Sequence, residues 1–157
     1  MKRKTFEDLI ADLAPHVQEI FPWDVLDEME SNPDIVLLDV RCPIEFQNMH
    51  IENSINVPRG VLETACDWGY EQTLPELVEA RDKRVVVICR SGKRSVLAAY
   101  TLQLLGYKNV ASLKTGLRGW NDSEQELVNP AGKKVDLEEG DIYFQEKVRP
   151  EQLGPRS

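Results

Sequence analysis

The stretch that most constrains this chain is a short apolar run followed at once by a cysteine and a cation-rich loop. Residues 85–88 read Val-Val-Val-Ile, and such a β-branched run is typical of a strand buried on both faces. Residues 96–105 are mostly good helix formers, and Gly106 stands where a left-handed cap would end that helix. Strand, tight loop and helix in this order indicate an α/β protein. They place Cys89 at the carboxyl end of a strand, where α/β proteins hold their functional groups.

The rest of the chain alternates predicted strands with predicted helices. Runs of apolar and β-branched residues predict strands at 17–21, 35–38, 54–58, 85–88 and 109–113. Apolar spacing and proline positions predict helices or helical turns at 6–14, from Pro22, from Pro43, and at 61–66, 74–80, 96–105 and 117–124. We expect the apolar stripe of the central helix to comprise Val96, Leu97, Tyr100, Thr101, Leu104 and Leu105. This alternation predicts the α/β class, with a mostly parallel sheet and helices on both faces.

Length and charge limit the kinds of partner. The 157 residues suffice for one domain with a proper core, and 41% of them are hydrophobic. The formal net charge of −8 argues against nucleic acid and anionic membranes, both of which attract basic faces. No apolar run approaches the length of a membrane span, and residues 1–8 lack the apolar stretch of a signal peptide. We therefore expect a cytoplasmic protein with no nucleic-acid partner and no membrane partner.

The three cysteines lie far apart in the sequence. Cys42, Cys66 and Cys89 form no Cys-x-x-Cys pair, so neither a disulfide framework nor a zinc site is predicted, and we expect no metal and no cofactor. Cys66 falls on an apolar helical face and Cys42 precedes a proline with no cations after it, so both favour a structural or incidental role. Cys42 also stands near a strand end, which can bring it to the rim of a site.

Cys89 has the surroundings of a reactive thiol. A helix amino terminus, the cations Arg90, Lys93 and Arg94, and backbone N–H groups freed by a glycine turn would all favour its anion. Such loops lower a cysteine pKa by several units from about 8.5. The same groups make a concave anion site. The pattern predicts that a small anion is delivered onto the sulfur of Cys89.

Three separated motifs resemble those of one family. Residues 89–95, Cys-Arg-Ser-Gly-Lys-Arg-Ser, resemble the active loop of rhodanese-like sulfurtransferases in the Cys-Arg-x-Gly-x-Arg form associated with thiosulfate users. The family's upstream signature is similar to residues 39–41, 45–46, 50–51 and 56–58. Its downstream signature is similar to residues 115–117 with Trp120, although it often has Gly-Gly where this chain has Thr115-Gly116. The resemblance covers about residues 17–124. It leaves out a helical extension at 1–16 and a charged extension at 125–157, which we expect to pack on the domain or trail from it.

The resemblance implies a three-layer fold and a reaction. The fold would be a five-stranded parallel sheet of order 3-2-4-5-1 with helices on both sides. Cys89 would attack the outer sulfur of thiosulfate, release sulfite and hold the sulfur as a persulfide. Cyanide, a thiol or a protein cysteine would then accept it. The residues expected to bind the donor are Arg90, Ser91, Gly92, Lys93, Arg94, Ser95 and Arg41.

Other residues near these motifs are open to more than one interpretation. Asp39 and Arg41 could form an ion pair that ties loops together, which is common in the family, or Arg41 could contact substrate. Glu45 stands where some members have a basic substrate-binding residue, so donor contacts would shift to the loop. His50 fits a hydrogen-bonded structural histidine, since thiolate attack on thiosulfate needs no general base. The tryptophans are expected in the core or in packing contacts: Trp23, Trp68 and Trp120.

Two other functions remain open at the level of sequence. A phosphatase or arsenate reductase could use the same fold and Cys-loop-Arg cradle. However, this loop has four residues between Cys89 and Arg94, where protein phosphatases have five. A persulfide carrier could receive sulfur from an upstream protein and pass it on, with little turnover of free thiosulfate.

Overall fold

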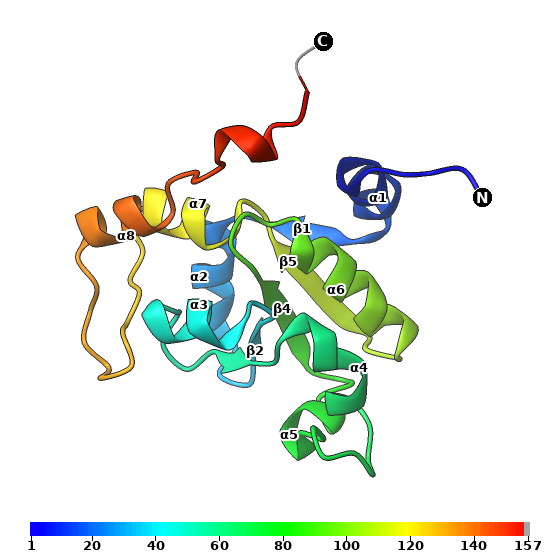
Figure 1. Ribbon diagram of the computed structural model, residues 1–157. Helices are drawn as coiled ribbons and strands as arrows, with labels where there is room; N and C mark the ends of the chain where they lie inside the picture. The colour runs from blue at the N-terminus through cyan, green and yellow to red at the C-terminus, as the bar shows by residue number, and fades with distance from the viewer. Residues whose placement is uncertain (156–157) are drawn as a thin grey trace.

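Five parallel strands form one sheet at the centre of the molecule (Figure 1). The computed structural model describes residues 1–155. The strands are β1 (Gln18–Ile20), β2 (Val36–Asp39), β3 (Ile55–Asn56), β4 (Arg84–Ile88) and β5 (Asn109–Leu113). Their order across the sheet is β3-β2-β4-β5-β1, and every pair is parallel. The predicted α/β class and the strand order 3-2-4-5-1 are confirmed.

The central strand β4 carries the two halves of the core on its opposite faces. All five of its residues are buried. Because side chains alternate along a strand, Val85 and Val87 face one apolar cluster while Val86 and Ile88 face the other. Cys89 follows directly and continues the first series. The parallel neighbours β2 and β5 end at the same edge of the sheet, so the loops after all three strands meet around Cys89.

Helices cover both faces of this sheet (Figure 1). The first cluster is packed by α1 (Phe6–Leu13), α4 (Leu62–Ala65), α5 (Pro75–Val78) and α6 (Arg94–Leu104). The second is packed by α2 (Pro22–Ser31), α7 (Gly116–Asp122) and α8 (Leu137–Tyr143), next to α3 (Pro43–Asn48). Residues 1–155 also contain three short 3₁₀ turns: η1 (Ala14–His16), η2 (Arg59–Val61) and η3 (Pro150–Gln152). Within residues 1–155, no helix combines the length and the apolar character needed to cross a membrane.

The buried face of α6 agrees with the predicted stripe only in part: Val96 is buried, and Tyr100 and Leu105 pack against the first cluster. Its most deeply buried residues include Ser95, Ala98, Ala99 and Leu102, whereas Leu104 is 72% exposed. Positions 95, 98, 99 and 102 follow helical spacing, so the face is a true stripe rotated from the expected one. Ser95 fixes this rotation because its side chain faces the sulfur of Cys89. The small alanines then let α6 lie close to the sheet.

The C-terminal extension shares the core of the domain. Leu127, Val128 and Phe144 are buried, and two of them join the second cluster. Val128 also pairs in antiparallel fashion with His50 through backbone hydrogen bonds of 2.8 and 3.0 Å. The domain boundaries at 16/17 and 124/125 stay predictions, and Arg156 and Ser157 of the predicted extension lie outside the described residues. Sequence patterning did not predict α8.

Only one of the three tryptophans lies in the core. Trp120 is buried, and its indole N–H donates to the carbonyl of Glu126 at 2.9 Å. Trp23 and Trp68 are 55% and 58% exposed, so neither lies in the core. Trp23 nevertheless makes a packing contact, because its ring stacks on Phe21. The buried residues of α2 are Pro22 and Val25, and the intervening Trp23 therefore points outward. Trp68 lies in the connection between α4 and α5.

Candidate active site

Three hydrogen-bonding groups surround the sulfur of Cys89, and we call them the ring of donors: the N–H groups of Gly92 and Ser95 and the hydroxyl of Ser95. The sulfur accepts hydrogen bonds from the backbone N–H groups of Gly92 at 3.1 Å and Ser95 at 3.3 Å. The thiol also bonds the hydroxyl of Ser95 at 3.3 Å, and that hydroxyl bonds Ser112 at 2.7 Å. A serine hydroxyl can donate once the sulfur is an anion. This geometry stabilises negative charge on a thiolate or on the outer sulfur of a persulfide.

Two glycines allow the loop to close this tightly. Gly92 has φ +86°, and a Cβ on it would lie 2.8 Å from the backbone nitrogen of Thr115. Gly116 has φ +60°, and a Cβ there would lie 2.5 Å from the carbonyl of Arg90. No larger side chain fits either position. The first N–H groups of α7 complete the support, because Leu117 donates to the carbonyl of Cys89 at 2.9 Å.

Each cation of the loop is engaged by another part of the chain. The Arg94 guanidinium forms a bidentate pair with Glu45, both N–O distances being 3.0 Å. Lys93 forms an ion pair with Glu7 of α1. Arg90 donates to the carbonyl of Gln145 at 2.7 Å, and its guanidinium also lies 5.9 Å and 5.8 Å from the ring centroids of two tail aromatics, Tyr143 and Phe144. The loop is therefore clamped by α1, α3 and the C-terminal extension.

The Glu45–Arg94 pair is ionised at neutral pH. Burial acts to raise the pKa of Glu45, but the hydrogen bonds and charge of Arg94 outweigh it and lower that pKa. The same hydrogen bonds raise the pKa of Arg94, and the neighbouring Cys89 and Cys42 act in the same direction. Any anion that is to bind Arg94 would therefore have to displace Glu45.

Asp39 and Arg41 form the expected ion pair in a fully buried position. Arg41 Nε and Nη2 contact the carboxylate at 3.0 and 2.8 Å, and Nη2 also donates to the carbonyl of Met49 at 2.8 Å. Asn56 donates to the carbonyls of Asp39 and Arg41 at 3.0 Å. The pair joins the end of β2 to the segments after α3 and in β3. Arg41 Nη1 is buried and has no partner within residues 1–155, so substrate contact by Arg41 stays a prediction.

The histidine and the two other cysteines lie outside the ring of donors. His50 Nδ1 bonds the carbonyl of Phe46 at 2.8 Å, and its ring stacks on Phe46 at 3.9 Å. Cys42 is exposed at the start of α3. Cys66 is buried, and burial raises the pKa of its thiol. These positions agree with the structural or incidental roles expected for all three residues.

Sequence reasoning missed the contribution of the tail to the site. Tyr143 has its pKa raised by burial, and its phenol lies within the electrostatic reach of Arg41, Glu45, Arg90 and Arg94. The one sequence feature that could have indicated this contact is the run Ile-Tyr-Phe at 142–144, the single apolar cluster of a charged segment. A long-range contact of this kind leaves no local periodicity.

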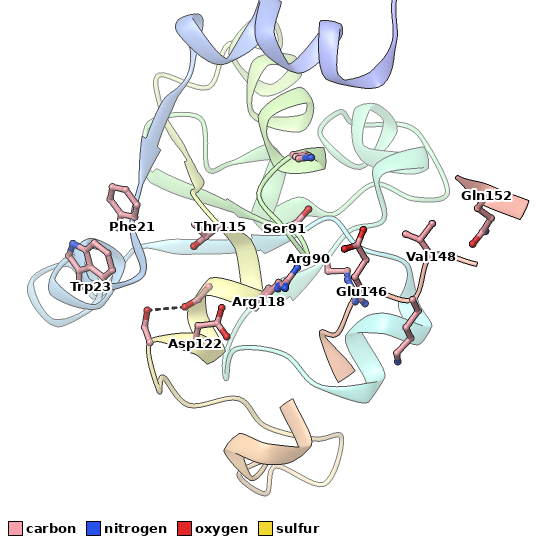
Figure 2. Close-up of a pocket in the computed structure, with 14 residues that line it drawn as sticks. Phe21, Trp23, Arg90, Ser91, Thr115, Arg118, Asp122, Glu146, Val148 and Gln152 are labelled. Atoms are coloured by element: carbon pink, nitrogen blue, oxygen red, sulfur yellow. Dashed lines mark hydrogen bonds between the residues drawn. The ribbon is translucent and has the colours of Figure 1, made fainter. Parts of the chain in front are cut away.

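A cavity of about 1110 Å³ adjoins the loop (Figure 2). Arg90, Ser91 and Lys93 form part of its wall. Other parts come from the start of α2, the first turns of α7 and the segment 146–152. Because Cys89 itself has no exposed surface, a donor or acceptor must approach past these rim side chains.

The structure thus places Cys89, with two backbone N–H groups directed at its sulfur, at the carboxyl end of the central parallel strand, where α/β proteins hold their functional groups. Residues 23–123 match the rhodanese-like domain. This chain belongs to the rhodanese-like family, as its motifs predict.

The chain is similar to proteins named for sulfur chemistry and to a solved structure described as a possible phosphatase. A fission-yeast (Schizosaccharomyces pombe) protein named "Putative thiosulfate sulfurtransferase, mitochondrial" is 36% identical over 110 residues, 66% of this chain and 78% of its own length. A "Putative sulfur carrier protein" of Bacillus subtilis is 31% identical over 107 residues, 68% of this chain but only 52% of its own length. A Rhodopseudomonas palustris structure of unknown function, described as a "Possible Tyrosine Phosphatase", has a TM-score of 0.71 and 28% identity. It aligns over 80% of this chain and 95% of that one.

Proposed function

We propose that this chain is a sulfurtransferase that carries sulfane sulfur as a persulfide on Cys89, with thiosulfate as donor and cyanide or a thiol as acceptor. The observation that carries the proposal is the set of donors from Gly92 and Ser95 aimed at the sulfur. A sulfur anion is both the attacking group and the form of the intermediate. The same donors therefore serve both halves of the reaction.

Each half is a displacement at sulfur. The Cys89 thiolate attacks the outer sulfur of thiosulfate, the S–S bond of thiosulfate breaks, and sulfite leaves with the bonding electrons. The acceptor then attacks the outer sulfur of the persulfide, and Cys89 leaves as a thiolate. Cyanide would yield thiocyanate, and a thiol would yield a new persulfide. No external oxidant or reductant is needed in either step.

Intact mass spectrometry tests the covalent intermediate. Thiosulfate is expected to add one sulfur atom to the wild type, and cyanide is expected to remove it. Cys89→Ser should gain no sulfur, while Cys42→Ser, a change at an exposed cysteine outside the ring of donors, should load normally. A Cys89→Ser protein that still loads would overturn the assignment. Turnover of p-nitrophenyl phosphate with no thiocyanate formed would instead support a phosphatase.

The pairing of the loop cations favours a second candidate, a persulfide relay. Lys93 and Arg94 are neutralised by Glu7 and Glu45, which weakens attraction for a free dianion. A persulfide on another protein carries less charge and is positioned by its own surface, so it depends less on these cations. The similarity to a named sulfur carrier supports the same role. Loading from a small persulfide at least about tenfold faster than from thiosulfate, equal to about 1.4 kcal/mol, would favour the relay.

A further inference from the structure

The cavity beside the Cys89 loop has a flat aromatic platform at one end. Phe21 and Trp23 stack with their ring centroids 4.7 Å apart and an interplanar angle of 7°, and Figure 2 shows both rings on the side away from Val148 and Gln152. Trp23 is 55% exposed, so ring surface remains open to a ligand. An exposed stacked pair is a binding surface for another planar ring.

The rest of the cavity wall is rich in positive charge. Its charged residues are the cations Arg90, Lys93, Arg118 and Lys147 and the carboxylates Asp122 and Glu146. The whole chain carries a net charge of −8, so this excess of cations is local. Arg118 and Lys147 make no ion pair among the described residues, and the Lys147 ammonium lies 5.4 Å from the ring centroid of Tyr143. They are therefore available to an anionic ligand.

The proposed function adds a further constraint on the chemical class of the ligand. The acceptor must bring a thiol to a persulfide on Cys89, and three rim residues of the Cys89 loop line this cavity. One class of molecule satisfies these conditions together. It carries a planar ring for the aromatic platform, anionic groups for the cations and a thiol that can reach the Cys89 loop. A volume of about 1110 Å³ is sufficient for a ligand of that size.

We propose that this cavity binds the acceptor of the sulfur transfer, and that this acceptor is a thiol bearing a planar base and phosphate groups. The proposal rests on the persulfide chemistry proposed above. The acceptor thiolate attacks the outer sulfur on Cys89, the S–S bond to Cys89 breaks, and a new S–S bond forms on the acceptor. One neutral sulfur atom moves between two thiolates, so atoms and electrons balance without a further reactant.

The test uses full-length protein loaded with sulfur and freed of donor. Its discharge is followed against the concentration of coenzyme A, of pantetheine, which has the same thiol arm without the nucleotide, and of glutathione. Coenzyme A is expected to reach half-saturation at about tenfold lower concentration than pantetheine, the gain typical of one stacked base. Adenosine diphosphate should raise the half-saturation for coenzyme A, and its binding should be detectable by calorimetry.

Matched variants locate the effect. Trp23→Leu and Arg118→Gln should each remove most of the advantage of coenzyme A over pantetheine, and Cys89 should still load one sulfur atom in both variants. Trp68→Leu is the control for the first, because Trp68 is equally exposed but does not line the cavity. Lys83→Gln is the control for the second, since Lys83 is exposed just before β4, at the opposite end of that strand from Cys89.

Three results would overturn the proposal. They are equal half-saturation for coenzyme A and pantetheine, tighter saturation by glutathione than by coenzyme A, and an equal loss in Trp68→Leu and Trp23→Leu. Failure of the protein to load sulfur would contradict the proposed function instead. Binding of adenosine diphosphate, lost in Trp23→Leu, reports on the cavity independently of that loading.

Discussion

Arg94, the first residue of α6, and Glu45, in the first turn of α3, form a bidentate ion pair with two N–O distances of 3.0 Å. The pair joins the helix that follows the Cys89 loop to the helix that follows β2. It thereby fixes the loop, and it also occupies the arginine that an anionic donor would use. Glu45 is in this way a structural partner of the loop, and under the proposed function it would also compete with the donor.

Replacing this carboxylate should strengthen the use of thiosulfate. Glu45→Gln frees Arg94 for the dianion, so the KM for thiosulfate is expected to fall about three- to tenfold at low salt, and the gain should shrink as salt is added. The measurement is thiocyanate formation with cyanide. Glu63→Gln, which breaks the more exposed Arg59–Glu63 pair, is the control and should leave KM unchanged. A raised KM in Glu45→Gln would show that Arg94 needs Glu45 to hold its position.

The same pair predicts a pH dependence of stability. The pKa of Glu45 is lowered from its ordinary value of 4.5 in the folded state, so folding favours the ionised form. The contribution of the ionised Glu45 to the free energy of unfolding is therefore complete above pH 4.5. It is lost as the pH falls through the lowered pKa. Urea unfolding of wild type and Glu45→Gln should give a constant difference from neutral pH down to about 5 that disappears at lower pH. A difference that grew on acidification would contradict the direction of the shift.

The buried Asp39–Arg41 pair should be far more sensitive to mutation than surface pairs. Asp39→Asn leaves a guanidinium with no exposed surface and no counter-charge, which is expected to cost about 3–5 kcal/mol of unfolding free energy. Asp82→Asn, which breaks the exposed Lys108–Asp82 pair, should cost less than about 1 kcal/mol. Chemical denaturation measures both. Equal losses would show that Arg41 finds other partners.

The backbone of Thr115 has a conformation that is unfavourable for a threonine. It has φ +69°, in the left-handed region that a β-branched residue rarely adopts. Thr115→Gly should raise the unfolding free energy by about 0.5–1 kcal/mol, because relief of this strain exceeds the extra entropy of glycine in the unfolded chain. Thr64→Gly, at a residue of α4, is the control and should lower it. A Thr115→Gly protein less stable than wild type would mean that contacts of the threonine side chain outweigh the strain.

The C-terminal extension is expected to be part of the folded core. Truncation after Gln125 removes Leu127, Val128 and Phe144, all buried, and each such side chain contributes about 1.5–3 kcal/mol by burial. The melting temperature of the truncated protein should fall sharply. Truncation after Leu153 removes only exposed or undescribed residues and should leave it unchanged. Equal melting temperatures for both truncations would leave the extension as a dispensable addition.

Local sequence patterns were sufficient to predict the strands and the position of the Cys89 loop. The strand at 109–113 is found at the predicted residues, and the apolar run before Cys89 is the buried central strand. The helix predicted at 6–14 begins at residue 6, where Thr5 and Asp8 form a capping box. These features depend on residues adjacent in sequence, where β-branching, glycine and capping chemistry act directly. The rotation of the buried face of α6 and the exposure of Trp23 and Trp68 could not be predicted, because neighbouring elements decide which side chains are buried.

The sequence by itself determined the α/β class, the central buried strand and the place of the Cys89 loop after that strand, because strand burial and turn chemistry are encoded locally. Only the tertiary structure decided which residues pair with the cations of that loop. The partners of Arg94, Arg90 and Lys93 lie 49, 55 and 86 residues away along the chain. No local pattern records such distances. Folding around the sheet brings these partners together and so converts three cations beside Cys89 into three anchored side chains.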